Sequence, residues 1–419
     1  MVRGFFPLDE ELGLVPGQLT PRLQESLTRL GTWMPFRHAA AELAYFTGVT
    51  VSETTARRVA EQAGAAYVVV QTAEVTELER TLPQPPVGPD RLLMSTDGAF
   101  VPLVGGEWTE VKTLALGVIA EPVLEKGERV VHTGALSYFS RRSEAADFTR
   151  QALVETQRRG VETAGQVAAV TDGAEWIQGF IDYHRSDATR ILDFPHALEH
   201  LATAGRIVYG EGTPAFTAWF EPLAHRLKQA EPEETLTELR HLLKQAQVNG
   251  VNAEGVATVQ AQLDYLDKRR PMIAYAEFRQ RGLPIGSGCV ESANKLVVES
   301  RLKQAGMRWA LEHVNSMLAL RNVASNDRWA EAWPQMIEQR REQRRQQARS
   351  TPTEPAPEAP PLNTPTVTAT LPNPAVVETP LTTVEPAPQA KSPYRPAPDH
   401  IWRRSPIGRA RFQPSHAKI

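Results

Sequence analysis

Two short apolar runs in this sequence end in the same tripeptide. Residues 92–98 read LLMSTDG and residues 168–173 read AAVTDG, so Asp172 follows Asp97 by 75 positions. A short apolar run bounded by turn residues is typical of a buried strand. Asp-Gly is also common turn chemistry, because Asp bonds its own backbone and Gly accepts a positive φ. The two copies therefore predict either two ordinary turns or two strands that each end on a carboxylate. In the second case the two carboxylates would lie close together.

Strand and helix patterns alternate around these runs. Residues 91–141 contain the apolar runs RLLMSTDG, EWTEVKTLALGVIA and RVVHTGALSYF, and Gly105-Gly106 predicts a hairpin turn between the first two. Residues 143–158 have helical spacing, and VAAVTDG and ILDF then read as strands that are each followed by helical sequence. Such alternation indicates an α/β fold, in which helices lie on the faces of a mixed sheet.

The N-terminal part of the chain has a different, helical pattern. LTPRLQESLTRLG predicts a helix with a Thr-Pro start and a Gly stop, and a later helix ends at Gly48. After a short turn, Ser52 can cap a further helix that carries Arg57 and Arg58. This helix-turn-helix pattern over residues 18–66 is shared by DNA-binding proteins and ordinary helical bundles.

Two other segments interrupt or follow the α/β region. Residues 205–282 are helical in pattern and predict an all-helical insertion, after which GLPIGSG breaks the chain and a helix starts near Val290. The last segment is rich in proline and basic residues, and it predicts a disordered tail. The predicted organisation is a helical DNA-binding region at 1–90, the first part of the core at 91–204, the insertion at 205–282, the C-terminal core helices at 283–345 and the tail at 346–419.

Composition narrows the class of protein only moderately. A formal net charge of −3 excludes neither nucleic acid nor any other partner, and the single cysteine, Cys289, excludes an intrachain disulfide and a cysteine-built zinc site. The first residues contain acids too early for a signal peptide, and no stretch is apolar enough to span a membrane. We therefore expect a soluble cytoplasmic protein.

Three acidic residues occupy notable positions: Asp97 and Asp172 after predicted strands, and Glu291 at the start of the helix after GSG. Mg²⁺ and Mn²⁺ prefer oxygen ligands, and two or three carboxylates can hold a pair of ions. An acid on each of two strands and a third on a helix is the arrangement of RNase H-like nucleases and transposases. Glu299, two helical turns after Glu291, is a rival third ligand.

The sequence resembles DDE transposases of bacterial insertion sequences, of the ISKra type that is related to the Mutator-like group. The stretches that carry the resemblance are STDGAFVPL, GGEWTEVK, VTDGAEWI, ILDFPHALEHL, LPIGSGCVESANKLVVESRLKQAGMRW and RPAPDHIWRR. It implies an RNase H-like core interrupted by a helical insertion, with Asp97, Asp172 and Glu291 holding two Mg²⁺ or Mn²⁺ ions. Asp193 and His196 match the D-x-x-H element that the Mutator-like group carries between its second Asp and its Glu.

Several other residues have both a functional and a structural interpretation. Asp193 and His196 could lie near the active site, or serve as a helix cap and a core histidine. His200, four residues after His196, could form a zinc pair with it but lacks a third ligand. The cations on and after the Glu291 helix suit DNA phosphates or a solvated face: Lys295, Arg301, Lys303 and Arg308. Three alternating residues are expected on a strand surface: Trp108, Glu110 and Lys112.

The residues thus favour a transposase that cuts the ends of an insertion sequence and joins the freed 3′-hydroxyl to target DNA. Its partners would be double-stranded DNA at both element ends and at the target, with a homodimer or higher oligomer to bring the ends together. A second hypothesis is a truncated or repurposed DNA-binding derivative without catalysis. A third, a sugar hydrolase with Asp97 and Asp172 as acid and base, leaves the basic helix unexplained.

Overall fold

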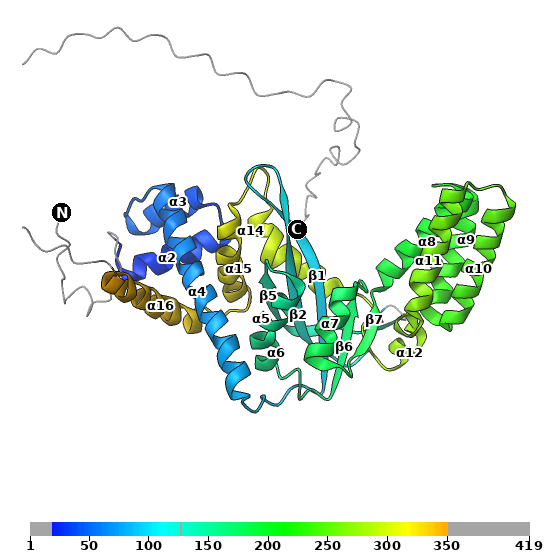
Figure 1. The fold of residues 1–419 in the computed structure, drawn as a ribbon, viewed down its shortest axis with the longest axis horizontal. Helices are drawn as coiled ribbons and strands as arrows, with labels where there is room; N and C mark the ends of the chain where they lie inside the picture. Colours follow the sequence, from blue (N-terminus) through cyan, green and yellow to red (C-terminus); the bar gives the residue numbers. More distant parts are fainter. Residues whose placement is uncertain (1–18, 126–127, 351–419) are drawn as a thin grey trace, which may run out of the picture. The chain divides into compact units, whose positions relative to one another are not determined.

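Five strands form one mixed sheet in the computed structural model, which describes residues 19–125 and 128–350 (Figure 1). The strands lie in the order β5-β2-β1-β6-β7. Their bounds are β1 (Arg91–Pro102), β2 (Trp108–Ile119), β5 (Thr133–Arg141), β6 (Gln166–Thr171) and β7 (Thr189–Leu192). Strands β1, β2 and β5 form an antiparallel meander, whereas β6 and β7 run parallel to β1 on its other side. The predicted mixed α/β class is confirmed.

The register of β1 and β6 follows the spacing of the two tripeptides. Arg91 pairs with Gln166 and Met94 pairs with Ala169, so every pair is separated by 75 positions. The same offset continues past the ladder, where the Ser95 hydroxyl donates a hydrogen bond of 2.5 Å to the Val170 carbonyl. Asp97 and Asp172 therefore stand at equivalent heights on neighbouring strands.

The structure corrects one expectation about β1, which does not end at Asp97. It continues to Pro102, because residues of β2 extend the antiparallel ladder as far as Trp108. The turn of this hairpin is at Gly105 and Gly106, with φ of 103° and 96°, as predicted. The parallel pairing with β6 does end before Asp97, because the last residue of β1 that pairs with β6 is Met94.

One face of the sheet is covered by three helices that follow the meander and β6. Phe148 and Phe180 from these helices are fully buried with Leu92 and Leu114 of the sheet. The helices are α5 (Ala145–Gln151), α6 (Leu153–Arg158) and α7 (Glu175–Arg185). Residues of β1 with even numbers in this stretch face them, since side chains alternate along a strand.

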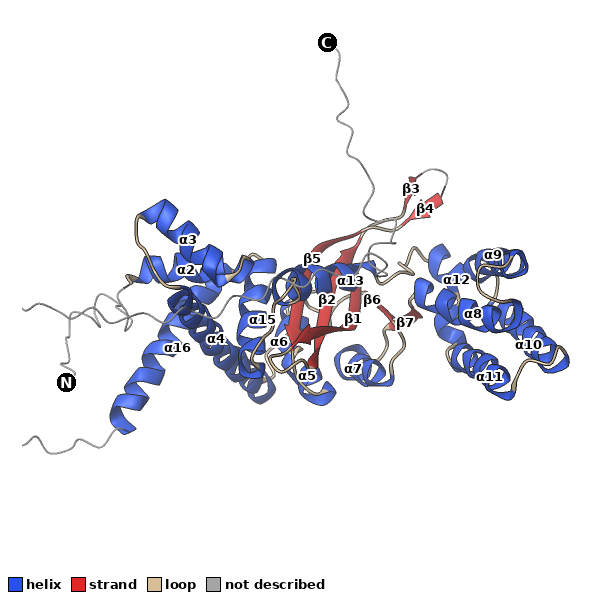
Figure 2. Ribbon diagram, turned by 90° about the horizontal axis from the view of Figure 1, so that it is seen from above, coloured by secondary structure: helices blue, strands red, loops and turns tan. Residues whose placement is uncertain are grey.

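The opposite face is covered by helices from the end of the described chain (Figure 2). Val290 and Val297 pack there with Ala99 and Val101 of β1. The elements are α13 (Gly288–Ala293), a π-helical stretch η2 (Asn294–Glu299), α14 (Ser300–Leu302) and α15 (Leu311–Ser325). The predicted helix after GSG is thus confirmed, with a π-helical middle that periodicity did not predict.

The N-terminal helices pack on α15 and on the last helix, α16 (Trp329–Ser350). They are α2 (Pro21–Trp33), α3 (Phe36–Thr47) and α4 (Glu53–Thr81). As predicted, Gly48 ends α3 in the left-handed conformation, and the Ser52 side chain caps α4 by accepting a hydrogen bond from Thr55 N. Gly31, in contrast, does not stop α2, which continues to Trp33; Gly31 is buried, and a Cβ there would lie 3.4 Å from the Phe36 ring.

The predicted insertion is helical throughout. Asp193 caps α8 (Phe194–Tyr209), so the helical region begins before residue 205. The remaining elements are α9 (Pro214–Gln229), α10 (Pro232–Val248), α11 (Ala253–Lys268), the 3₁₀ turn η1 (Arg270–Ile273) and α12 (Tyr275–Gln280). Helices α8, α9, α10 and α11 pack together, and η1 contacts β7.

A short hairpin of β3 (Val123–Glu125) and β4 (Glu128–Val130) leads from β2 to β5. The Pro-rich part of the predicted tail, with Trp402 and the basic end, lies outside the described residues. Among the helices of residues 19–125 and 128–350, none is both long and apolar enough to cross a membrane.

Candidate carboxylate site

Asp97 and Asp172 have related positions in the structure. Leu93 of β1 shares one buried cluster with Ala168 and Val170 of β6. Side chains on a strand alternate with a period of two, so Asp97 follows Leu93 on that face, and Asp172 comes directly after the end of β6. Both residues therefore follow the end of the parallel pairing between β1 and β6, and the charge of Asp172 acts on Asp97.

These strand ends form a topological switch point. From β1 the chain continues to β2 on one side, whereas from β6 it continues to β7 on the other. Open α/β sheets bind ligands in the crevice outside such strand ends. The two carboxylates are therefore treated as a candidate site.

The helix that carries Glu291 covers this end of the sheet. Asn294, one turn after Glu291, donates a hydrogen bond of 2.9 Å from Nδ2 to Asp97 Oδ2. The other oxygen of Asp97 accepts a bond of 2.7 Å from the Gly98 amide. Asn294 is also the first residue of η2, and π-helical turns often occur at functional positions.

Asp97 is affected by the charges of two other acids. The pKa of Asp97 is raised above its ordinary value, first by burial and then by the negative charges of Asp172 and Glu291, while the bonds from Gly98 and Asn294 oppose the shift. Glu299, the rival third ligand, instead forms a 3.0 Å ion pair with Lys303. The charges of Asp172 and Glu291 thus act on Asp97, whereas Glu299 has a partner of its own.

Asp172 lies in a turn whose backbone is hydrogen-bonded by residues of the helical insertion. Asp172 Oδ1 accepts a bond of 2.9 Å from the Ala174 amide, which closes the turn. Tyr265 of α11 donates its hydroxyl to the Asp172 carbonyl at 2.5 Å, and Arg269 donates to the Gly173 carbonyl at 2.8 Å. Gly173 has a φ of 80°, and a Cβ there would lie 2.7 Å from Arg269 Nε. We call Tyr265 and Arg269 the turn clamp.

The turn clamp is part of a layered stack of side chains. The Arg269 guanidinium lies 3.6 Å from the centre of the Tyr265 ring, a cation–π contact. The His200 ring stacks on Tyr265 at 3.8 Å, with an angle of 17° between the planes. Burial lowers the pKa of His200, and its Nε2 lies 3.3 Å from Nε2 of His196. The D-x-x-H histidine thus contacts the clamp through His200.

Asp193, the other member of that element, links the insertion to the loop before Glu291. It is 5% exposed, and its Oδ2 accepts a bond of 3.1 Å from the His196 amide as a helix cap. Its Oδ1 accepts a bond of 2.6 Å from the Ser287 amide in the GSG loop. The structural interpretation of Asp193 as a cap is confirmed, and its second bond fixes the start of α13.

The donor chemistry of this site suits a hard divalent cation, because it gathers carboxylates whose negative charges raise the pKa of Asp97. The ligands are not preassembled, however. Within the described parts of the chain, no group of three or more His, Cys, Asp or Glu is placed so that it could hold a metal ion. The same finding applies to the pair of His196 and His200, which has no third ligand among those residues.

The predicted DNA-binding cations divide into two groups. The exposed ones are Arg57, Arg58, Lys295, Lys303 and Arg308. Arg301 is only 1% exposed, so the prediction that it contacts DNA is wrong. Its guanidinium donates to the Gly31 carbonyl at 2.9 Å and packs over the Trp309 ring, and burial lowers its pKa to about 10.

Lys112 was expected on a strand surface and is instead buried. Its Nζ bonds to Glu110 at 2.8 Å and to the Ser143 carbonyl at 3.2 Å. Trp108, in contrast, is exposed as expected. Cys289 is partly buried and packs against the core, and burial raises the pKa of its thiol to about 11, which agrees with a packing role rather than a nucleophile.

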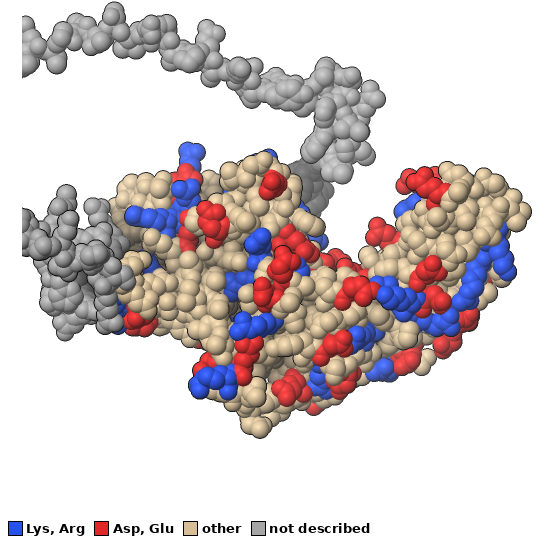
Figure 3. All heavy atoms as spheres, viewed as in Figure 1, with Lys and Arg blue, Asp and Glu red and all other residues tan. Residues whose placement is uncertain are grey.

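Two further surface features lie apart from the carboxylates. On the face drawn in Figure 3, basic and acidic side chains are interspersed and form no single basic stripe.

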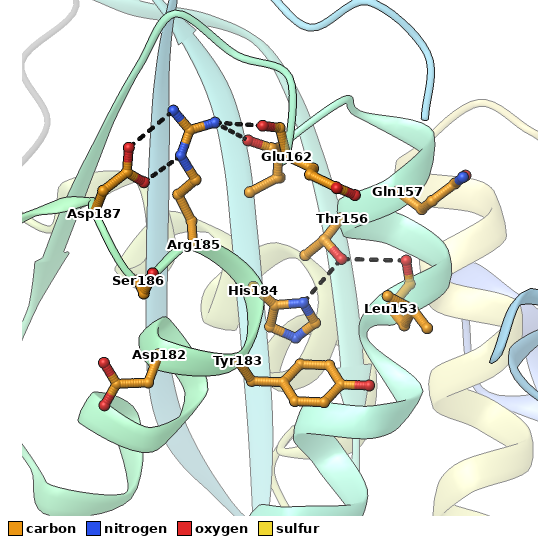
Figure 4. A pocket seen from close by; sticks show the side chains of 11 residues that line it. Leu153, Thr156, Gln157, Glu162, Asp182, Tyr183, His184, Arg185, Ser186 and Asp187 are labelled. Atoms are coloured by element: carbon orange, nitrogen blue, oxygen red, sulfur yellow. Dashed lines mark hydrogen bonds and ion pairs between the residues drawn. The ribbon is translucent and has the colours of Figure 1, made fainter. Parts of the chain in front are cut away.

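A cavity of about 540 Å³ between α6 and α7 is lined by polar residues (Figure 4). Its polar groups bond to one another: His184 Nδ1 to the Thr156 hydroxyl, and Arg185 to Asp187 and to the carbonyls of Val161 and Glu162. We therefore do not assign it to the site.

Sequence patterns missed three residues of the site: Asn294, Tyr265 and Arg269. Asn294 could have been found, because it follows Glu291 by three positions on the same helix. The turn clamp has no signal of its own in the sequence, since Tyr265 and Arg269 stand in an ordinary amphipathic stretch.

Comparison with known proteins finds a distant relative. No family model matches the chain. The chain is similar to the "UPF0236 protein in vanSb 3′region" of Streptococcus gallolyticus, with 24% identity over 332 residues. That alignment covers 77% of this chain and 68% of the relative.

Proposed function

We propose that the protein is a DDE transposase, which cleaves DNA phosphodiester bonds at the ends of an insertion sequence and transfers the freed 3′-hydroxyl to a target. The observation that supports this proposal is the shared register of Asp97 and Asp172 beside the parallel pair β1 and β6, together with the hydrogen bond from Asn294, three residues after Glu291, to the Asp97 carboxylate. The resemblance of the motifs around these residues to ISKra-type transposases points in the same direction.

An RNase H-like core is part of the proposal. Such a core combines an antiparallel three-stranded meander with parallel strands beside its first strand, an acid on the first and fourth strands, and a third acid on a later helix. The order β5-β2-β1-β6-β7, with Asp97 in β1 and Asp172 after β6, supports this assignment.

Each residue has a distinct task in the proposed reaction. Asp97, Asp172 and Glu291 would hold the divalent ions, which when bound activate the attacking hydroxyl and stabilise the departing oxygen. Asn294 holds the Asp97 carboxylate, and the turn clamp holds the backbone of Asp172. The exposed cations of α4, η2 and the segment after it would contact the phosphates of double-stranded DNA.

The test uses labelled fragments of the DNA that flanks the gene, incubated with the full chain and Mg²⁺ or Mn²⁺. We expect Asp97→Asn, Asp172→Asn and Glu291→Gln each to lower cleavage by about a thousandfold or more, while DNA binding is retained. Glu299→Gln is the matched control and should cut normally, because Glu299 pairs with Lys303. Normal cutting by Asp172→Asn would overturn the assignment.

A second readout does not depend on finding the right DNA. Binding of Mn²⁺, followed by electron paramagnetic resonance, should weaken in the three site variants and remain unchanged in Glu299→Gln. Equal binding by all four variants would remove the metal site from the proposal.

The second candidate function is a DNA-binding transposase derivative without catalysis. The observation that favours it is that no metal-ligand group is preassembled among the described residues. DNA binding without metal-dependent cleavage, together with absent Mn²⁺ binding, would support this alternative. For the transposase, two DNA ends must be brought together, so we expect a homodimer or higher oligomer on DNA.

A further inference from the structure

A second cavity, of about 390 Å³, lies beside the loop that leads to Glu291. Residues from β4, α8, α9, α12 and the GSG loop line it. Its volume falls within the range of pockets that take small ligands. It is formed jointly by the sheet hairpin and the helical insertion, two parts of the chain that are far apart in sequence.

The lining of this cavity combines an apolar floor with a basic rim. Phe194, Leu283 and Ile285 provide apolar surface. Three cations come from three different elements: Arg129, Lys228 and Arg279. None of the described side chains that line the cavity is acidic, although the whole chain has slightly more acidic than basic residues. The cavity therefore suits an anion that also carries a flat apolar group.

The cavity is joined to the loop before Glu291 by one backbone hydrogen bond and one bond to the Asp193 carboxylate. The Phe194 amide donates to the Ile285 carbonyl at 2.9 Å, and the next link is the bond from the Ser287 amide to Asp193. Gly288 lines the cavity and is also the first residue of α13. Glu291 follows three residues later, roughly 5 Å along the helix axis.

We propose that this cavity binds one unpaired nucleotide of the DNA strand whose phosphate lies at the carboxylates. The base would stack on Phe194, since aromatic rings bind bases of any sequence. Arg129 and Arg279 would contact the adjoining phosphates, since a guanidinium can bind phosphate through two parallel bonds. This inference rests on the proposed function and names the form of its substrate: a DNA end with at least one nucleotide unpaired.

The experiment measures binding of a fluorescein-labelled oligothymidine to the full chain, by anisotropy, over a range of KCl concentrations and in EDTA. For the double variant Arg129→Ala, Arg279→Ala we expect about tenfold weaker binding. Its plot of log affinity against log salt should be shallower by about 1.4, because each single-strand phosphate contact contributes about 0.7 to the slope.

The matched control is Arg281→Ala. Arg281 lies two residues after Arg279 and pairs with Glu277 outside the cavity, so this variant removes the same charge as the single variant Arg279→Ala without touching the lining. It should leave both affinity and slope unchanged. If Arg281→Ala and Arg279→Ala weaken binding equally, the effect is that of general charge and the inference is wrong.

A change at Phe194 separates stacking from charge. Phe194→Leu keeps an apolar side chain but loses the ring, so affinity should fall about tenfold with the salt slope unchanged, and Phe194→Trp should restore it. Because no metal is present, these results do not depend on cleavage. If the site variants abolish cleavage but oligothymidine binding is indifferent to the arginines and to Phe194, the transposase proposal stands and the nucleotide site does not.

Discussion

The two Thr-Asp-Gly copies share a sequence but not a structural context. Asp97 lies inside β1, where β2 pairs with the strand on one side and Asn294 binds the side chain. Asp172 lies after the end of β6, in a turn whose backbone is held by Tyr265 and Arg269 of the insertion. The first carboxylate is positioned by the sheet and the Glu291 helix. The second carboxylate is positioned by the helical insertion, which is not part of the sheet.

The two glycines of these copies offer the most direct way to test that difference. Gly173 has a φ of 80° and lies against the turn clamp, whereas Gly98 has ordinary backbone and faces only the movable carboxylate of Glu110. We expect Gly173→Ala to lower the free energy of unfolding by about 2 kcal/mol, because of the left-handed backbone and the displaced clamp. Gly98→Ala should lower it by less than about 1 kcal/mol. Urea unfolding measures both, and equal losses would contradict the contrast.

The clamp itself gives the next largest expected effect. Arg269→Ala removes a charged donor from the Gly173 carbonyl, and we expect a loss of about 1.5 kcal/mol in the free energy of unfolding. Its neighbour Arg270 is more exposed and pairs with Asp267 and Glu233, so Arg270→Ala should cost less than about 0.5 kcal/mol. If the two variants unfold alike, Arg269 does not hold the turn.

The smallest expected effect concerns the electrostatic interaction between the carboxylates of Asp97 and Asp172. The pKa of Asp97 is raised, so the stability that comes from its protonated form is present at low pH and is lost as the pH rises from about 4 through the raised pKa. Asp172→Asn removes one of the charges responsible and should move the pKa of Asp97 downward. A ¹³C NMR titration of labelled aspartates in EDTA would follow this, and an unchanged pKa would mean that the two carboxylates do not interact.

The sheet could be predicted from sequence because strand runs, turn glycines and helix caps are local signals. Gly48, Ser52 and the Gly105-Gly106 turn all behave as their residue types require. The end of β1 could not be predicted, because Asp-Gly is compatible with either a turn or a strand, and the partner strand β2 decides between them. The buried Arg301 was missed for a similar reason: a cation on a helix reads as exposed until the carbonyl and aromatic rings that surround it are known.

Within the candidate site, the sequence indicated the acids but not what holds them. Glu291 and Asn294 share a helix, so their relation follows from spacing alone. Tyr265 meets Asp172 across 93 positions, and no periodic pattern reports a contact of that kind.

The hydrogen bond between the two ends of the helical insertion has a consequence for how this chain could have evolved. The insertion leaves the core at Phe194 and returns at Ile285, and the backbones of these two residues are joined by a hydrogen bond. A segment whose ends are adjacent can be added to or exchanged in a host fold at little cost to the host, because closing a longer loop adds only slowly to the entropy lost on folding. Genes for this core could therefore gain, lose or trade the whole helical segment in one event, as long as the new segment again supplied a donor for the turn at Asp172.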